Sequence, residues 1–230
     1  MTHTKVLTLD QYWEALAPHL PSFQPEDQQT AVTLYRELAK GQPVDAEQLG
    51  RALGVTLEEA RTLLERDSIK AFIYPDGEGR VLGFGGLAAA PMHHRFDVDG
   101  RTLWTWCAWD SLFIPEILGK RAHVVSPDPV SGELVQLVVT PHNIEAAAPS
   151  GTLVSFLLPD AHGFDVSAAN VMAKFCHFVF FFGSRVSGER WMDRHPGTFL
   201  FSLAEAFALA QRLNERNFGS ELAKRASAIL

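Results

Sequence analysis

The spacing of apolar residues changes near residue 68, and this change divides the chain into two parts. Before it, apolar residues recur every three or four positions, which is typical of amphipathic helices. From Ile69 onward the spacing moves toward two, which is typical of half-buried strands. The sequence therefore predicts an α+β chain, with a helical N-terminal region at residues 1–67 and a sheet-and-helix core at residues 68–230.

Capping signals divide the N-terminal region into helices. Thr8 and Thr56 each open a capping box, with Gln11 and Glu59 three residues later. Four helices are expected, at about 8–20, 25–40, 45–53 and from 56 onward. The last two are joined by a turn of the helix-turn-helix kind, which occurs both in DNA-binding proteins and in small packing modules. The glutamates on the second of these helices make a poor face for phosphates, so a packing module is favoured.

Turn signals organise the second part. The segment 75–79 and the pair Asp99-Gly100 each predict a hairpin. Strands are expected at about 71–74, 80–87, 122–126, 134–140, 152–158 and 175–182. Helices are expected at about 106–118, 188–195 and 203–217, and the chain beyond Phe218 is expected to be frayed or loosely docked.

The formal net charge is −7, which disfavours nucleic acid and anionic membranes as partners. No apolar run reaches the roughly 18 residues that a membrane helix needs, and residues 1–5 do not resemble a secretory signal. The two cysteines do not suggest a disulfide scaffold. We therefore expect a cytoplasmic protein with reduced thiols, which binds neither nucleic acid nor membrane.

Both cysteines lie among aromatic residues, Cys107 in Trp-Cys-Ala-Trp-Asp and Cys176 in Phe-Cys-His-Phe. Two thiols are too few for a structural zinc site but suit a soft metal. If residues 106–118 are helical, Cys107 and Asp110 share one face. Apolar surroundings would raise the pKa of Asp110, so that this carboxyl group could carry a proton at neutral pH. Ordinary core packing of both cysteines, or a disulfide, stays open on these residues alone.

Two weaker motifs carry less information. The segment Gly83-Phe84-Gly85-Gly86 lacks the lysine of a phosphate-binding loop and is expected to mark a bulge or a close backbone contact. The pair His93-His94 lacks the spacing of a zinc motif and is expected at a strand edge.

Several of these segments, in this order, resemble the organomercurial lyases, also called alkylmercury lyases. The resemblance runs from about residue 41 to about residue 213, and its strongest stretches are residues 41–44, 94–101, 106–115, 175–184 and 195–197. It implies a winged-helix-like N-terminal region before the catalytic core. It also implies that Cys107, Cys176 and Asp110 form the catalytic set. Many relatives have a further cysteine where this chain has Asp128, which puts only auxiliary metal handling in doubt.

The resemblance implies that carbon–mercury bonds are cleaved by protonolysis, giving a hydrocarbon and Hg(II) held by the two cysteines. It implies no organic cofactor, an exogenous thiol for turnover, and transfer of Hg(II) to thiols or to a mercuric reductase. Four aromatic residues are expected either to line the substrate pocket or to pack in the core: Trp106, Trp109, Phe175 and Phe178. Two alternatives remain, a non-catalytic organomercury or metal sensor that uses the same cysteines, and a relative that has lost activity.

Overall fold

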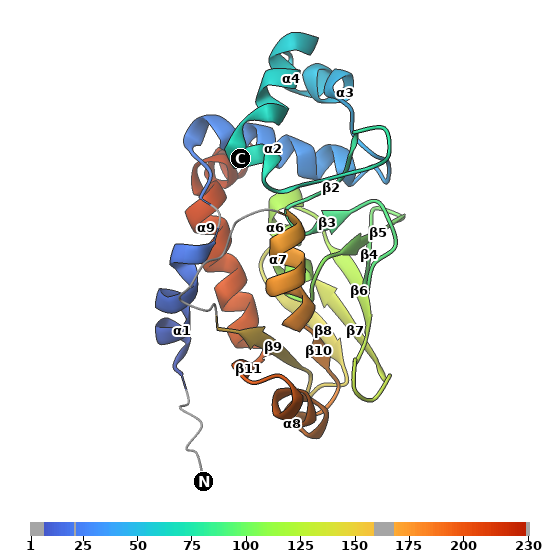
Figure 1. Ribbon diagram of the computed structural model, residues 1–230, viewed down its shortest axis with the longest axis vertical. Helices are drawn as coiled ribbons and strands as arrows, with labels where there is room; N and C mark the ends of the chain where they lie inside the picture. The colour runs from blue at the N-terminus through green and yellow to red at the C-terminus, as the bar shows by residue number, and fades with distance from the viewer. Residues whose placement is uncertain (1–6, 21, 159–167, 229–230) are drawn as a thin grey trace.

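The computed structural model describes residues 7–20, 22–158 and 168–228 and has the predicted α+β class (Figure 1). The helices within these ranges are α1 (Leu9–Leu16), α2 (Pro25–Leu38), α3 (Ala46–Leu53), α4 (Leu57–Glu65), α5 (Asp67–Lys70), α6 (Asp110–Leu118), α7 (Ala168–Lys174), α8 (Arg185–Arg194) and α9 (Leu203–Ala228), with 3-10 turns η1 (Ala17–His19) and η2 (Cys176–Phe178).

The predicted capping boxes explain where two of the N-terminal helices begin. Thr8 caps α1 together with Gln11, and Thr56 caps α4 together with Glu59. Helix α3 ends at Gly54, whose φ of 73° is left-handed backbone that glycine adopts without strain. The helix boundaries in this region therefore follow local side-chain chemistry.

The strands form two antiparallel sheets in the described part of the chain. One has eight strands in the order β1-β2-β3-β5-β4-β6-β7-β8, and the other has the order β10-β9-β11. Their bounds are β1 (Ile73–Pro75), β2 (Val81–Phe84), β3 (Leu87–Ala88), β4 (His94–Val98), β5 (Arg101–Thr105), β6 (Ala122–Pro127), β7 (Leu134–Val139), β8 (Ile144–Ala148), β9 (Leu153–Leu157), β10 (Phe181–Phe182) and β11 (Thr198–Ser202).

The turn between β4 and β5 confirms one predicted hairpin. Asp99 and Gly100 have φ of 48° and 72°, and the two strands pair in register from Val98 opposite Arg101. Two adjacent positive φ values are the signature of the tight turn that Asp-Gly favours.

The predicted strand at 175–182 is wrong over most of its length. Cys176 lies in η2, and only Phe181–Phe182 pairs, with β9. The Phe-Cys-His-Phe alternation suggested a strand, but this short segment follows α7 and forms a tight turn, in which the Phe178 N–H donates to Phe175 O.

Two helix predictions also need correction. Helix α6 begins at Asp110, so Cys107 precedes the helix. Helix α9 continues through Phe218 to Ala228, because that face is covered: Phe218 is 2% exposed and the Ser220 hydroxyl donates to Gln28. The chain from Phe218 to Ala228 is therefore helical, and Ser220 docks it on α2.

Helix α6 connects the layers that surround the site. It packs against α9, against α2 and against β7 (Figure 1). One continuous apolar core includes Leu34 and Tyr35 from α2, Phe96 from β4, and Trp109. Residues before and after position 68 thus contribute to the same interior. Within the described ranges, no helix is both long and apolar enough to cross a membrane.

Candidate active site

A short turn after β5 places Cys107 against Asp110. The Thr105 hydroxyl donates to Cys107 O at 2.9 Å, and the Cys107 backbone N–H donates to Asp110 Oδ2 at 2.7 Å. Both residues are buried, at 0% and 6% exposure. The hydrogen bond from the Cys107 backbone therefore holds the Asp110 carboxyl group close to the thiol at the start of α6. The two side chains do not share one face of a helix, as the sequence suggested.

Cys176 reaches the same place from the second half of the chain. Val179 N donates to Cys176 O at 3.1 Å, which closes η2, and Ala108 N donates to Val179 O at 3.1 Å. This second bond joins the segment after Cys107 to the segment after Cys176. Both cysteines are free thiols and both are buried. The disulfide alternative is therefore not what the structure contains.

The two sulfur atoms and a carboxylate oxygen form one cluster. The Sγ atoms of Cys107 and Cys176 and an oxygen of Asp110 all lie within 4.8 Å of one another. It is the one group of at least three such potential ligands that is found among the described residues. Since zinc–thiolate bonds are about 2.3 Å long and bonds to a larger ion are longer, two sulfur atoms at this separation can share one metal ion.

Burial controls the protonation of this cluster. It raises the pKa of the Asp110 carboxyl to about 7, although hydrogen bonds from Cys107 and Trp106 act in the opposite direction. Burial, the hydrogen bond to Cys176 and the charge of Asp110 hold the pKa of Cys107 well above its ordinary value. The hydrogen bond with Cys107 lowers the pKa of Cys176, but burial and the charge of Asp110 outweigh it and leave that pKa raised. Near neutral pH both thiols are therefore protonated, whereas the Asp110 carboxyl group is present in both its protonated and its ionised form.

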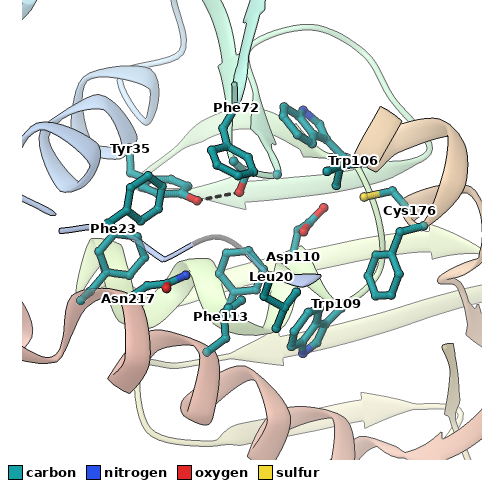
Figure 2. Close-up of a pocket in the computed structure, with 16 residues that line it drawn as sticks. Leu20, Phe23, Tyr35, Phe72, Trp106, Trp109, Asp110, Phe113, Cys176 and Asn217 are labelled. Carbon is teal, nitrogen blue, oxygen red and sulfur yellow. Dashed lines mark hydrogen bonds between the residues drawn. The ribbon is translucent and has the colours of Figure 1, made fainter. Parts of the chain in front are cut away.

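A glycine turn holds the other side of Asp110. Gly86 has φ of 103°, and a Cβ atom added there would lie 2.6 Å from Asp110 Cγ. Gly86 O accepts a hydrogen bond from Trp106 N at 2.9 Å. The neighbouring Gly85 O accepts one from the Tyr35 hydroxyl at 2.6 Å, drawn as the dashed line in Figure 2. The predicted close backbone contact is confirmed, and the backbone lies directly against the acid.

An apolar cavity of about 70 Å³ opens beside this cluster (Figure 2). It is lined by Leu20, Phe23, Tyr35, Phe72, Gly85, Gly86, Trp106, Trp109, Asp110, Phe113, Val171, Phe175, Cys176, Leu213, Asn217 and Phe218. A cavity of about 150 Å³ is known to admit benzene, so this one suits a short chain without rearrangement.

The four aromatic residues predicted for the pocket do not lie together. Trp106, Trp109 and Phe175 line the cavity. Phe178 is not in the lining, and its ring packs against that of His195, with centroids 5.8 Å apart. Phe178 follows Cys176 by two residues, but η2 turns the chain between them.

Sequence reasoning missed the lining residues contributed by distant elements. Tyr35 comes from α2, Phe72 from the segment before β1, and Asn217 and Phe218 from α9. The spacing of apolar residues marks most of these positions as buried but gives no sign of the cavity that they share. The one local signal was the glycine pair at 85–86.

Asp128 occupies a separate, fully bonded position. It is 1% exposed, and its carboxylate accepts hydrogen bonds from the backbone N–H groups of Val130, Ser131 and Gly183 and from the Ser187 hydroxyl. Burial alone would raise the pKa of Asp128, but these hydrogen bonds lower it below its ordinary value. Asp128 therefore ties the β6–β7 turn to Gly183, which follows β10, and to Ser187 in the first turn of α8, and it does not line the cavity.

Two buried thiols beside a carboxyl group that exchanges its proton near neutral pH define a site for a soft metal coupled to proton transfer. The family model described as alkylmercury lyase matches residues 87–215. An alkylmercury lyase from Staphylococcus epidermidis is 35% identical over 80% of this chain and 80% of that protein. One from Pseudomonas putida is 38% identical over 77% of this chain and 79% of that protein. The chain belongs to the alkylmercury lyase family.

A solved structure supports the fold independently of these sequences. The mercury-bound form of MerB2 superposes with a TM-score of 0.68 and 20% sequence identity, covering 90% of this chain and 97% of that one.

Proposed function

We propose that this protein cleaves carbon–mercury bonds by protonolysis, with Cys107 and Cys176 as the mercury ligands and Asp110 as the proton carrier. One observation carries the proposal: the two sulfur atoms and the carboxylate oxygen lie within 4.8 Å of one another, and two of the three residues, Asp110 and Cys176, line an apolar cavity. Mercury prefers thiolates to oxygen or nitrogen ligands, so an organomercurial cation would bind the sulfur atoms first.

Because both thiols hold their protons at rest, binding of mercury must release them. The ionised form of Asp110 accepts one proton as a Cys–Hg bond replaces the S–H bond. When the second sulfur binds, two donors push electron density onto the metal and weaken the carbon–mercury bond. Asp110 then delivers its proton to the leaving carbon, so it acts as general base and then as general acid.

The overall change balances as R–Hg–X plus two Cys–SH giving R–H, Hg(II) bound by two thiolates, and H–X. One thiol proton ends on the hydrocarbon and the other leaves with X, which is a halide or a thiolate. No oxidation or reduction occurs, and the step needs no organic cofactor.

The aromatic lining has a role in this proposal. Trp106, Trp109 and Phe175 keep water from the carbon–mercury bond and contact the organic group. Hg(II) held between two buried thiolates would leave by exchange with exogenous thiols, and a mercuric reductase is the proposed final acceptor in the cytoplasm.

The test is release of hydrocarbon from methylmercury in the presence of excess thiol, measured by gas chromatography. Cys107→Ala and Cys176→Ala should each abolish release, and Asp110→Ala should bind mercury but release hydrocarbon poorly. Stoichiometric uptake of methylmercury by the unaltered protein without any methane would refute the lyase proposal. That result would favour the sensor alternative.

A further inference from the structure

The cavity contains one polar side chain that has no task in the proposed reaction. Asn217, in α9, is 2% exposed, and its Oδ1 has no hydrogen-bond partner among the described residues. Figure 2 shows it on the side of the cavity away from Cys176. An amide in an apolar wall is costly to bury unless something hydrogen-bonds to it.

Two other polar side chains of the lining have hydrogen-bond partners. The Tyr35 hydroxyl donates to Gly85 O, and Asp110 accepts from Cys107 N. Trp106 Nε1 is also buried without a partner, but it lies 3.4 Å from the position that a Cβ on Gly83 would take, so it faces β2.

A second asparagine in α9, Asn214, has a structural role. Asn214 lies one turn earlier, and its Nδ2 donates to Phe113 O at 2.9 Å and to Glu116 Oε2 at 2.8 Å. Its Oδ1, like that of Asn217, has no partner among the described residues, so the two asparagines differ at Nδ2 and in their position relative to the cavity. Asn214 therefore links α9 to α6. Asn217 makes no such link and lines the cavity.

We infer that Asn217 selects organomercurials whose organic group carries a hydroxyl a few atoms away from the carbon–mercury bond. This inference rests on the proposed lyase activity and names the substrate class of the same site. A hydroxyl both donates and accepts, so it satisfies the amide whichever way its oxygen and nitrogen are oriented. The small volume of the cavity, about 70 Å³, favours a short alkyl alcohol over a bulky ring.

The selectivity comes from the difference in hydrogen bonding between Asn217 and two kinds of substrate, one with a hydroxyl group and one without. With a purely apolar organic group in the cavity, Asn217 Oδ1 gains no hydrogen-bond partner from the substrate. With a terminal hydroxyl of the right reach, the amide is paired. A site built to hydrogen-bond its substrate discriminates against an analogue that lacks the group, because the buried polar atoms of the site are then unsatisfied.

The experiment compares 3-hydroxypropylmercury chloride with n-butylmercury chloride, and 4-hydroxybutylmercury chloride with n-pentylmercury chloride. Each pair has the same number of non-hydrogen atoms, and the products are an alcohol and an alkane. For the unaltered protein, kcat/KM should be about tenfold higher for the hydroxyl compound in at least one pair. This factor corresponds to the contribution of one net hydrogen bond. Asn217→Leu should remove this preference.

A matched control is Gln211→Leu, which makes the same change from amide to leucine at an exposed position of α9 outside the cavity. It should leave the preference at its original value. Because the main comparison uses the unaltered chain, it does not depend on the folding of any variant.

The outcomes separate the two claims. Equal kcat/KM within both pairs would overturn the role of Asn217, whose amide would then bind only water, and would leave the lyase proposal intact. A preference that survives in Asn217→Leu would also overturn it. Absence of both alcohol and alkane would refute the lyase activity and this inference with it.

Discussion

Replacing Gly86 by alanine tests whether the glycine turn sets the position of Asp110, the proposed proton carrier. The added Cβ would lie 2.6 Å from Asp110 Cγ and 2.7 Å from Oδ1. To reach an ordinary contact of 3.4 Å, the carboxyl group has to move by about 0.8 Å. A displacement of about 1 Å at a reacting group costs on the order of 100-fold in rate, so we expect kcat to fall by about that factor.

The same substitution also costs stability. Alanine at φ of 103° is strained by about 1–3 kcal/mol, and overpacking adds about 1–3 kcal/mol. The matched control is Gly100→Ala, where φ is 72° but nothing lies within 4 Å of the added Cβ. That variant should lose only about 1–2 kcal/mol and keep its kcat. Thermal unfolding and hydrocarbon release are measured on both variants. Backbone strain lowers the stability of both, whereas displacement of the Asp110 carboxyl group lowers kcat in Gly86→Ala only.

The reasoning would be refuted by a Gly86→Ala protein that keeps the original kcat and unfolds no earlier than Gly100→Ala. Such a result would mean that the contact between the turn and the acid relaxes without cost, and that hydrogen bonds such as that from Cys107 N–H position Asp110 without the turn.

Three further predictions follow from the buried polar groups. Burial raises the pKa of Asp110 from 3.8 to about 7, so between these values the unfolded chain ionises while the folded one does not, and stability falls as pH rises. The free energy of unfolding of Asp110→Asn, relative to that of the original protein, should therefore rise from pH 4 to pH 7 by at most about 1.4 kcal/mol per pH unit. The difference in melting temperature between the two proteins should increase over this range, and a pH-independent difference would contradict this. Tyr35→Phe leaves Gly85 O without the Tyr35 hydroxyl and should cost about 1–3 kcal/mol in urea unfolding, with a lower kcat; unchanged values of both would show that this hydrogen bond does not hold the glycine turn in place. Asp128→Ala removes four hydrogen bonds and should destabilise by about 3 kcal/mol without changing kcat at a temperature where it is folded; a large loss of kcat would contradict its structural role.

Local chemistry explains which parts of this molecule are predictable from sequence. The capping boxes at Thr8 and Thr56 and the Asp99-Gly100 turn each depend on neighbouring residues, and each is present as predicted. The class of the fold followed from the change in apolar spacing near residue 68. These signals act over a few positions, so no knowledge of the remaining chain was needed to interpret them.

The site was harder to predict because long-range contacts form it. The sequence around Cys107 and Asp110 pointed to their chemistry, but the helix was expected to include Cys107. In the structure the Cys107 N–H is bonded by the Asp110 carboxylate, and α6 starts only there. Cys176 was expected on a strand because aromatic alternation has the period of a strand, and tertiary packing produced η2 instead. Asn217 lies 110 positions after Cys107, and no local pattern connects them.

The position of α9 has a consequence for newly made protein. Helix α9 supplies Asn217 and Phe218 to the cavity, and Ala206 O accepts a hydrogen bond from Trp109 Nε1. During translation at roughly 5–20 residues per second, Cys176 therefore leaves the ribosome several seconds before the chain that completes its enclosure. A nascent chain exposed to mercury in that interval presents both cysteines before the cavity around them has formed. Mercury bound to these sulfur atoms at that stage would prevent the chain from folding into an active enzyme. Cells that already contain folded copies would protect the next ones during their synthesis.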